Sequence, residues 1–289
     1  MAVAEEGVVL ETCRTVEHAA DASRGAGLGR PNRASNFTSM STTQNLIGVD
    51  VGGSGIKAAL VDLDTGTASG RIRVETPQPA TPDAVSATVA TLVGQLNADG
   101  PIGCTLPAVV VGGTVRTAAH IDKAWIGTHA AAVFGRATGR RCTVLNDADA
   151  AGIAEARFGA ARGRRGVVVM VTVGTGIGTA LLNDGVLVAN SELGHLEVNG
   201  KIADSWASDA KRDEKHLSWG QWAERLNTYL TQLHAVLWPE LILIGGGVVK
   251  KADLFIDELN PGCEVEVAEL GNLAGIVGAA LAAASDKES

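Results

Sequence analysis

The alternation of apolar and polar residues divides the chain into a leader and a body. Residues 1–45 are rich in Ala, Arg, Gly, Ser and Thr and show no sustained hydrophobic period, so we predict that they form a disordered leader. From Leu46 onward, short apolar runs alternate with glycine turns and amphipathic stretches, a pattern typical of a mixed α/β protein. The expected strands are Leu46–Val51, Ile56–Leu63, Arg71–Glu75, Ala108–Val111, Thr143–Leu145, Val167–Val173, Thr179–Leu182, Val186–Ala189 and Leu241–Ile244.

Helices are expected where apolar residues recur at intervals of three and four. The clearest case is Asp83–Asn97, with Thr81 or Asp83 as its N-cap. Three further helices are predicted at Ala148–Phe158, Trp219–Leu237 and Gly275–Ala284.

An internal repeat indicates a duplicated fold. The segment Val49–Asp62, with Ser54 set aside, aligns with Val171–Asn183 at thirteen positions, of which seven are identical. Each copy predicts a strand, a glycine turn and a second strand. We therefore expect an N-terminal lobe over 46–145 and a C-terminal lobe over 146–289 with a cleft between them, and we expect the last helix to pack back on the N-terminal lobe.

Composition and charge narrow the function classes. The net charge of −8 argues against a general nucleic-acid binder, and no apolar run reaches the ~18 residues that a membrane helix needs. The four cysteines have no short C-x-x-C spacing, so we expect free thiols in a cytoplasmic protein and no zinc site.

The two glycine turns are candidate phosphate sites, because glycine lets backbone N–H groups converge on an anion. The alternative is a purely structural turn. Asp50, at the end of the first apolar strand, is a candidate Mg²⁺ ligand or a turn cap, and Lys57 either neutralises phosphate or extends its stem along the strand. The turn residues are Gly52, Gly53, Ser54 and Gly55 in the first copy and Gly174, Thr175 and Gly176 in the second.

Two polar clusters are candidate acceptor sites. Asn146 and Asp147 stand between a strand and a helix, where Asp147 could act as a general base and either residue could be a helix N-cap. Asp149 we assign to the first turn of that helix, as a complement to its dipole. Glu192 and His195 are three residues apart, which suits sugar hydroxyls, a metal ion or a structural hydrogen-bond network.

Four segments together resemble the repressor–ORF–kinase (ROK) family of sugar kinases. They are IGVDVGGSGIKAALVD, LNDADAAGIAEARFG, VTVGTGIGTALLNDGVLVANSELGHLEV and LILIGGGVVKKAD with NLAGIVGAA, in family order between Leu46 and Ala284. Because the ELGHLE segment is not followed by the family's cysteine-rich zinc motif, the chain is most similar to the polyphosphate-dependent branch.

The resemblance implies a duplicated actin-like ATPase (ribonuclease H-like) fold and a homodimer. It also implies phosphoryl transfer from polyphosphate, ATP or both to the 6-hydroxyl of glucose, with mannose as a further acceptor and Mg²⁺ as cofactor. Asp147 would be the general base. The sugar would be bound by Asn146, Glu192, His195 and His120. The donor would be bound by Asp50, Lys57, the two glycine turns, Gly245, Gly246 and Gly247, and by Lys250 and Lys251. Other basic residues between 201 and 216 lie among acidic ones, so we interpret that stretch as a solvated mixed-charge face.

Two departures from the family pattern leave other functions open. Ala108 replaces a glycine and His120 an asparagine at positions that border the sugar in the family. An ATP-only glucokinase and a catalytically weak sugar-binding relative are therefore alternatives. A sugar-sensing repressor is disfavoured, because residues 1–45 lack the pattern of two amphipathic helices.

Overall fold

The computed structural model describes residues 45–118 and 121–286. Contacts divide the chain into residues 1–41 and residues 42–289, and all described residues belong to the second unit. Residues 1–44 of the predicted leader and His120 lie outside the described residues.

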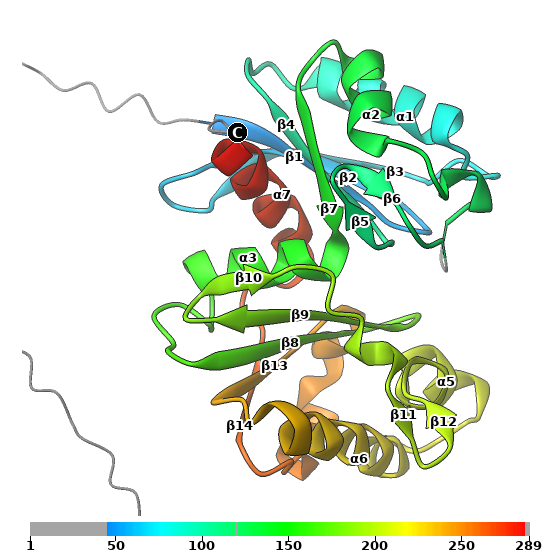
Figure 1. Cartoon of the computed structure of the whole chain (residues 1–289), viewed down its shortest axis with the longest axis vertical. Coiled ribbons are helices and arrows are strands. Elements are labelled where there is room, and N and C mark those ends of the chain that lie inside the picture. Colours follow the sequence, from blue (N-terminus) through cyan, green and yellow to red (C-terminus); the bar gives the residue numbers. More distant parts are fainter. Residues whose placement is uncertain (1–44, 119–120, 287–289) are drawn as a thin grey trace, which may run out of the picture. The chain divides into compact units, whose positions relative to one another are not determined.

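Two five-stranded sheets of the same design form the body (Figure 1). In each sheet the first strand pairs antiparallel with the second and parallel with a strand from much later in the chain. The order of the first sheet is β3-β2-β1-β4-β7, and that of the second is β10-β9-β8-β13-β14. The strands of the first sheet are β1 (Asn45–Val51), β2 (Ile56–Asp62), β3 (Ala68–Val74), β4 (Ile102–Leu106) and β7 (Cys142–Asn146). Those of the second are β8 (Val167–Val173), β9 (Ile177–Asn183), β10 (Val186–Val188), β13 (Leu241–Gly245) and β14 (Glu264–Val267).

The structure confirms that the sequence repeat is a structural one. Asp50 pairs with Lys57 across β1 and β2, and the aligned Thr172 pairs with Gly178 across β8 and β9. Both turns are closed by one backbone hydrogen bond, from the amide of Gly52 to the carbonyl of Gly55 at 3.0 Å and from that of Gly174 to Gly176 at 2.9 Å.

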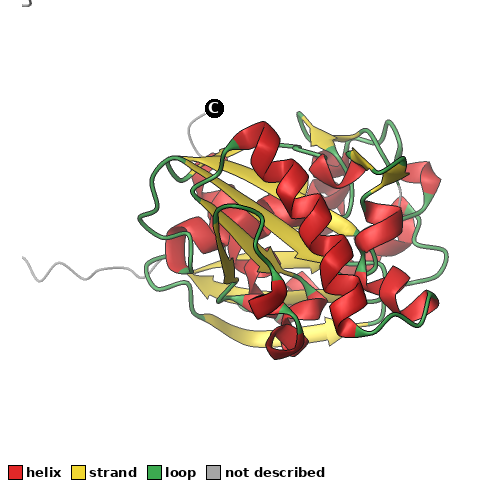
Figure 2. Ribbon diagram, turned by 90° about the horizontal axis from the view of Figure 1, so that it is seen from below, coloured by secondary structure: helices red, strands yellow, loops and turns green. Residues whose placement is uncertain are grey.

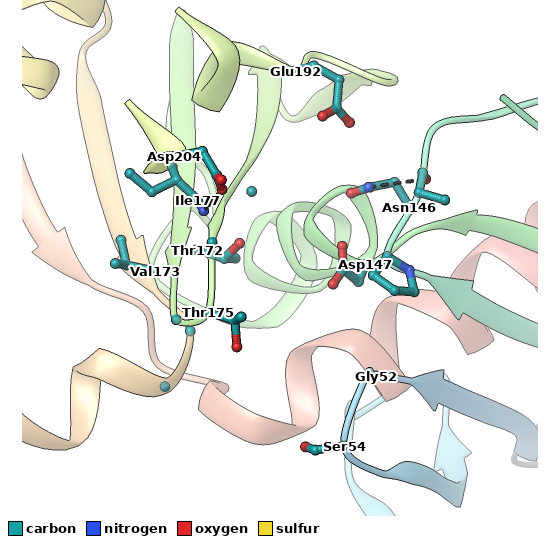
Figure 3. Close-up of a pocket in the computed structure, with 18 of the residues that line it drawn as sticks. Gly52, Ser54, Asn146, Asp147, Thr172, Val173, Thr175, Ile177, Glu192 and Asp204 are labelled. Carbon is teal, nitrogen blue, oxygen red and sulfur yellow. Dashed lines mark hydrogen bonds between the residues drawn. The ribbon is translucent and has the colours of Figure 1, made fainter. Parts of the chain in front are cut away.

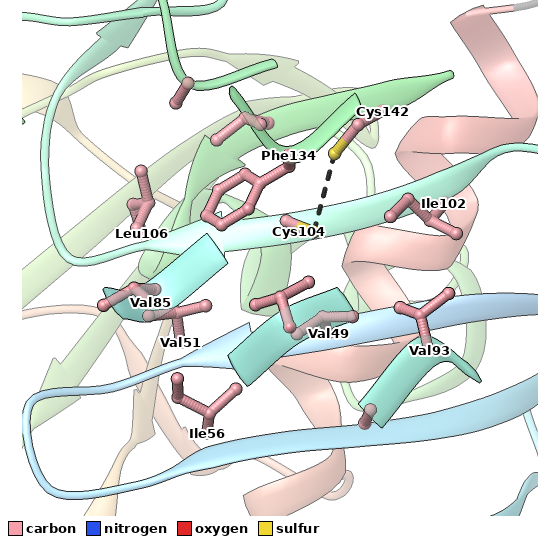
Figure 4. Close-up of a cluster of buried hydrophobic side chains, with 14 of the residues drawn as sticks. Val49, Val51, Ile56, Val85, Val93, Ile102, Cys104, Leu106, Phe134 and Cys142 are labelled. Carbon is pink, nitrogen blue, oxygen red and sulfur yellow. Dashed lines mark hydrogen bonds between the residues drawn. The ribbon is translucent and has the colours of Figure 1, made fainter. Parts of the chain in front are cut away.

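Helices and sheets alternate in layers because successive strand residues face opposite sides (Figure 1), and seen from below, helices lie in front of the strands (Figure 2). In the first sheet, Val49 and Val51 face the outer helices α1 and α2, where they pack with Cys104, Phe134 and other buried residues (Figure 4). In the second, Val169 and Val171 face α6. We use first lobe and second lobe for the parts built around the first and second sheets. The helices are α1 (Pro82–Gln95), α2 (Ala130–Thr138), α3 (Asp147–Phe158), α4 (Asp204–Ala207), α5 (Asp209–Glu214), α6 (Trp219–Leu237) and α7 (Ala274–Ser285).

Helices α3 and α7 lie between the sheets and pack closely on each other. Each one packs on the other lobe's sheet: α3 follows β7 but contacts β9, whereas α7 follows β14 but contacts β1 and β4. Small residues permit the approach, since a Cβ at Gly278 would lie 1.8 Å from the Ala150 carbonyl oxygen, and one at Gly48 would lie 1.9 Å from that of Ile276.

Short elements complete the chain. Two small hairpins are β5 (Val110–Val111) with β6 (Thr114–Val115), and β11 (Glu197–Val198) with β12 (Lys201–Ile202). The 3₁₀ helices are η1 (Lys123–Trp125), η2 (Leu193–His195), η3 (Gly247–Leu254), η4 (Ile256–Glu258) and η5 (Gly271–Leu273). None of the helices in the described part of the chain combines the length and apolar character required to traverse a bilayer.

Most predicted elements are confirmed, and the N-cap of α1 is Thr81. The strand predicted at Ala108–Val111 is wrong, because the sheet strand of this region is β4 at Ile102–Leu106 and only Val110 and Val111 form a short hairpin strand. The apolar signal of β4 is interrupted by Gly103, where a Cβ would lie 1.8 Å from the Ala279 carbonyl oxygen of α7. The third strand begins at Ala68 instead of Arg71, and helix α2 was not predicted.

Candidate active site

A cleft of about 540 Å³ contains both glycine turns and the junction of β7 and α3 (Figure 3). Gly52, Gly53 and Ser54 line one wall, and the second turn with Gly246 and Gly247 lines another. A smaller recess of about 220 Å³ shares Asp147, Thr172, Gly246 and Gly247 with the cleft and reaches Asp50 and Lys57. The turns that we predicted as phosphate sites therefore face the same space.

Asp147 is the first residue of α3, and its carboxylate points into the cleft (Figure 3). Burial raises its pKa to about 7, and the negative charges of Asp50 and Glu192 add to the rise against the opposing hydrogen bond from the Ala148 amide. A carboxylate with a pKa near neutral is suited to accept a proton from a substrate hydroxyl. The side chain is partly exposed to the cleft, so a substrate can reach it.

Asn146 is the N-cap of α3. Its Oδ1 accepts hydrogen bonds from the amides of Ala148 at 2.8 Å and Asp149 at 3.1 Å, while Nδ2 donates to the Ala108 carbonyl at 3.2 Å. The alternative that Asp147 is the cap is wrong, which leaves the Asp147 carboxylate facing the cleft. Asn146 also lines the cleft, so it fixes the end of the helix at the place where we predict the sugar.

Two oppositely charged side chains, Asp50 and Lys57, flank the first glycine turn. The Asp50 carboxylate accepts from Lys57 Nζ at 2.8 Å and from the Thr105 hydroxyl at 3.0 Å. Gly275, near the start of α7, lies so close that an added Cβ would stand 3.1 Å from the carboxylate. Asp50 is therefore held in place with both oxygens engaged, and Lys57 is not a lysine extended into solvent.

Backbone groups form most of the second turn. Gly246, with φ of 82°, packs against Val173, and any Cβ there would lie 2.4 Å from the Val173 carbonyl oxygen. Asp204 accepts a hydrogen bond from the Ile177 amide at 2.7 Å and lines the cleft. Our interpretation of residues 201–216 as a solvated mixed-charge face is thus wrong at Asp204, which helps hold the cleft wall beside the second glycine turn.

Glu192 and His195 occupy a short helical turn that packs on the second glycine turn. The Glu192 carboxylate faces the cleft (Figure 3). His195 Nδ1 lies 3.3 Å from that carboxylate. A Cβ at Gly194 would lie 2.2 Å from the Ile177 carbonyl oxygen, which explains the glycine in this segment. His195 is 59% exposed and does not line the cleft, so it contacts the site through Glu192.

The remaining predicted residues lie at the margins. Lys250 and Lys251 are exposed on η3, directly after the Gly245–Gly247 segment. Among the described residues, no cluster of three or more His, Cys, Asp or Glu side chains could bind a metal ion.

Two residues that line the cleft were not among the predicted site residues. Thr117 and Pro107 line the cleft from the segment that follows β4, on either side of the wrongly predicted strand Ala108–Val111. Asp149 lies in the first turn of α3, as predicted, but it is also only 1% exposed and accepts a hydrogen bond from the Asn190 amide at 2.8 Å, a contact that the sequence did not indicate. The one available signal for this contact was a second carboxylate, Asp149, close to the end of a buried strand.

Comparisons with known proteins agree with this geometry. The family model described as ROK family matches residues 46–216. The chain is 47% identical over 247 residues to a polyphosphate glucokinase of Mycobacterium tuberculosis (strain CDC 1551 / Oshkosh). The aligned region covers 85% of this chain and 93% of that relative.

Solved structures give the same result. The inorganic polyphosphate/ATP-glucomannokinase of Arthrobacter sp. strain KM superposes with a TM-score of 0.81 at 44% identity, covering 84% of this chain and 99% of that one. A ROK family glucokinase of Streptomyces griseus, in complex with glucose and AMPPNP, gives 0.72 at 25% identity, covering 84% and 100%. The predicted actin-like ATPase fold is confirmed by these likenesses, and the chain belongs to the ROK family.

Proposed function

We propose that this protein is a polyphosphate-dependent glucokinase, which transfers the terminal phosphoryl group of polyphosphate or ATP to the 6-hydroxyl of glucose or mannose. The observation that carries the proposal is Asp147, a carboxylate with a pKa near 7 in a cleft between two glycine turns. The names of the Mycobacterium and Arthrobacter relatives support the choice of donor and acceptor.

In this proposal Asp147 takes the proton of the attacking hydroxyl as the oxygen–phosphorus bond forms and the donor's bridging oxygen leaves. Asn146 and Glu192 orient the hexose from the two sides of Asp147, and His195 holds Glu192. His120 remains a predicted sugar ligand, since it lies outside the described residues. The amides of the two turns and Lys57 neutralise the donor phosphates.

Magnesium is part of the proposal. Asp50 is the carboxylate closest to the first turn, but its oxygens already accept from Lys57 and Thr105. Each of these oxygens keeps a second lone pair, so Asp50 could still act as a single carboxylate ligand for Mg²⁺, which keeps waters and binds largely through substrate phosphates. When bound, the ion neutralises charge on the donor phosphates.

For the distal phosphates of polyphosphate we propose a path past Lys250 and Lys251. Basic side chains on α5 are already neutralised: Lys211 and Lys215 pair with Glu214, and Arg212 pairs with Asp209 and Asp213. Among the ion pairs of the described residues, none includes Lys250 or Lys251. These two lysines therefore offer uncompensated positive charge close to Gly246 and Gly247, which line the cleft together with the second glycine turn.

A coupled assay for glucose 6-phosphate, with polyphosphate and ATP supplied separately alongside Mg²⁺, tests the function. We expect turnover with both donors. The double variant Lys250→Ala/Lys251→Ala should raise the KM for long-chain polyphosphate by roughly 5- to 20-fold, with the KM for ATP within about twofold. The control is Lys215→Ala, which removes an exposed lysine already paired with Glu214.

Each other outcome contradicts a part of the proposal. Turnover with ATP alone would identify an ordinary glucokinase, and binding of hexose without turnover would identify a sugar-binding relative. The homodimer and the cytoplasmic location implied by the family are proposals as well. Light scattering at assay concentrations tests the first, and localisation of a tagged full-length chain tests the second.

A further inference from the structure

Asn190 joins the two lobes beside the acceptor end of the cleft. Its Oδ1 accepts from the Val110 amide at 3.0 Å, and its Nδ2 donates to the Val110 carbonyl at 3.0 Å. Val110 belongs to β5 and to the apolar core of the first lobe, whereas Asn190 follows β10 of the second. One side-chain amide thus uses both its donor and its acceptor on one residue of the opposite lobe.

The backbone of Asn190 is fixed on the second lobe. Its φ is 60°, a left-handed conformation that asparagine tolerates better than most residues. Its amide donates to Asp149 Oδ2 at 2.8 Å, and Asp149 is 1% exposed on α3, two residues after the base Asp147. The bridge is therefore anchored on the helix that carries the proposed catalytic group.

Both segments that the bridge connects are held firmly. On the first lobe, Asn146 binds the Ala108 carbonyl, and the Val109 amide donates to the Thr117 hydroxyl at 3.0 Å. On the second lobe, the Leu193 amide donates to the Thr179 hydroxyl at 3.0 Å. Glu192 lies between Asn190 and Leu193, so both sides of its backbone are restrained.

The donor end of the cleft has no comparable bridge. Within residues 45–118 and 121–286, none of the hydrogen bonds joins the first glycine turn (Gly52–Gly55) to the second (Gly174–Gly176). The lobes are therefore connected directly where the hexose is expected and separate where the phosphates are expected.

We propose that Asn190 is a positioning residue that holds the Ala108–Val110 wall and Glu192 at the spacing that hexose binding requires. The inference rests on the proposed function. Without the bridge, the hexose itself must bring the two walls together, which lowers its apparent affinity. The donor turns do not depend on the bridge, so donor binding should be unaffected.

The test compares Asn190→Gly with Asn199→Gly. Asn199 is exposed in the turn between β11 and β12 and has φ of 52°, so both variants replace a left-handed asparagine by glycine. In Asn190→Gly we expect the KM for glucose to rise about 5- to 100-fold, the combined effect of two neutral hydrogen bonds. At saturating glucose, kcat and the KM for either donor should stay within about threefold of wild type. Asn199→Gly should match wild type.

A second variant separates positioning from folding. Asn190→Asp retains an acceptor for the Val110 amide and loses the bond to the Val110 carbonyl, so its KM for glucose should lie above wild type. The proposal would be overturned if both Asn190 variants raised the KM for the donor by the same factor as the KM for glucose and also lowered the thermal midpoint. An unchanged KM for glucose would overturn it as well. Failure of wild-type enzyme to phosphorylate glucose or mannose would instead contradict the proposed function, because the bridge is judged only by the ratio of variant to wild type.

Discussion

The two glycine turns are closed by equivalent backbone hydrogen bonds, but they differ in the chemistry of their side chains. In the first, the residues at the paired positions before and after the turn are Asp50 and Lys57, joined at 2.8 Å. In the second, the same positions hold Thr172 and Gly178, and a Cβ at Gly178 would lie 2.6 Å from the Thr172 hydroxyl oxygen. Duplication has thus produced one charged turn and one neutral turn around a single cleft.

The difference assigns separate tasks to the halves. The negative charge of Asp50 contributes to the raised pKa of Asp147, and Lys57 supplies positive charge for an anion in the same recess. The neutral turn offers backbone amides and can approach a phosphate chain closely without adding charge. In the proposed function, the charged turn would set the electrostatics of the reaction and the neutral turn would set the fit of the donor.

The largest expected effect concerns Asp147, which lies between the turns. Asp147→Asn removes the proton acceptor and nearly preserves shape, so kcat should fall by roughly 10²- to 10⁴-fold. Steady-state assays with both donors measure this, with circular dichroism as the folding control. Turnover near that of wild type would exclude Asp147 as the base.

A smaller effect is expected from the charged turn itself. Lys57→Met removes a charge-assisted contact to phosphate, so kcat/KM for the donor should fall about 10- to 100-fold. Thr172→Val at the position equivalent to Asp50 is the matched change in the neutral turn, and it should cost less than about fivefold. Equal losses in the two variants would show that the turns do not divide the work as described.

The pH dependence follows from the same carboxylate. Asp147 must be ionised to act as a base, so kcat should rise about tenfold per pH unit below a pKa of about 7 and level off above it. Rate profiles between pH 5 and 9, at saturating substrates, measure the inflection. A flat profile would mean that Asp147 is already ionised at low pH or that another step limits turnover.

Stability should show the smallest effect, with the opposite sign. The folded-state pKa of Asp147 lies above its ordinary value of 3.8, so the folded protein retains this proton longer than the unfolded chain and loses stability as pH rises from about 4 to 7. Asp147→Asn removes this loss. At pH 8 its thermal midpoint should exceed that of wild type, and the difference should vanish near pH 4. A lower midpoint at pH 8 would contradict the assignment.

Local patterns predicted most of the fold. The glycine repeat identified the duplication and its register, because identical turns need identical backbone geometry. The strand β4 was missed because Gly103 and Thr105 interrupt its apolar run, and both are required by tertiary contacts with α7 and Asp50. No sequence pattern encodes such contacts between segments far apart in the chain.

The candidate site shows the same division. Asp147, Glu192 and the two turns are marked by residue type next to strand ends, and they line one cleft. Asp204 and Asn190 carry no such mark: each acts through a hydrogen bond to the backbone of a distant segment, Ile177 and Val110 respectively. Only the structure reveals which of many surface-type residues is used in this way.

The exchange of α3 and α7 between the sheets has a consequence for biosynthesis. The inner face of the first sheet, including Gly48 and Gly103, is covered by Ile276 and Ala279 of α7, near the end of the chain. During synthesis, the first lobe therefore emerges from the ribosome with one face of its sheet still exposed to solvent. The core between the two sheets, to which α7 contributes, closes only after α7 has been translated, so a nascent chain stopped before Ala274 should depend on chaperones.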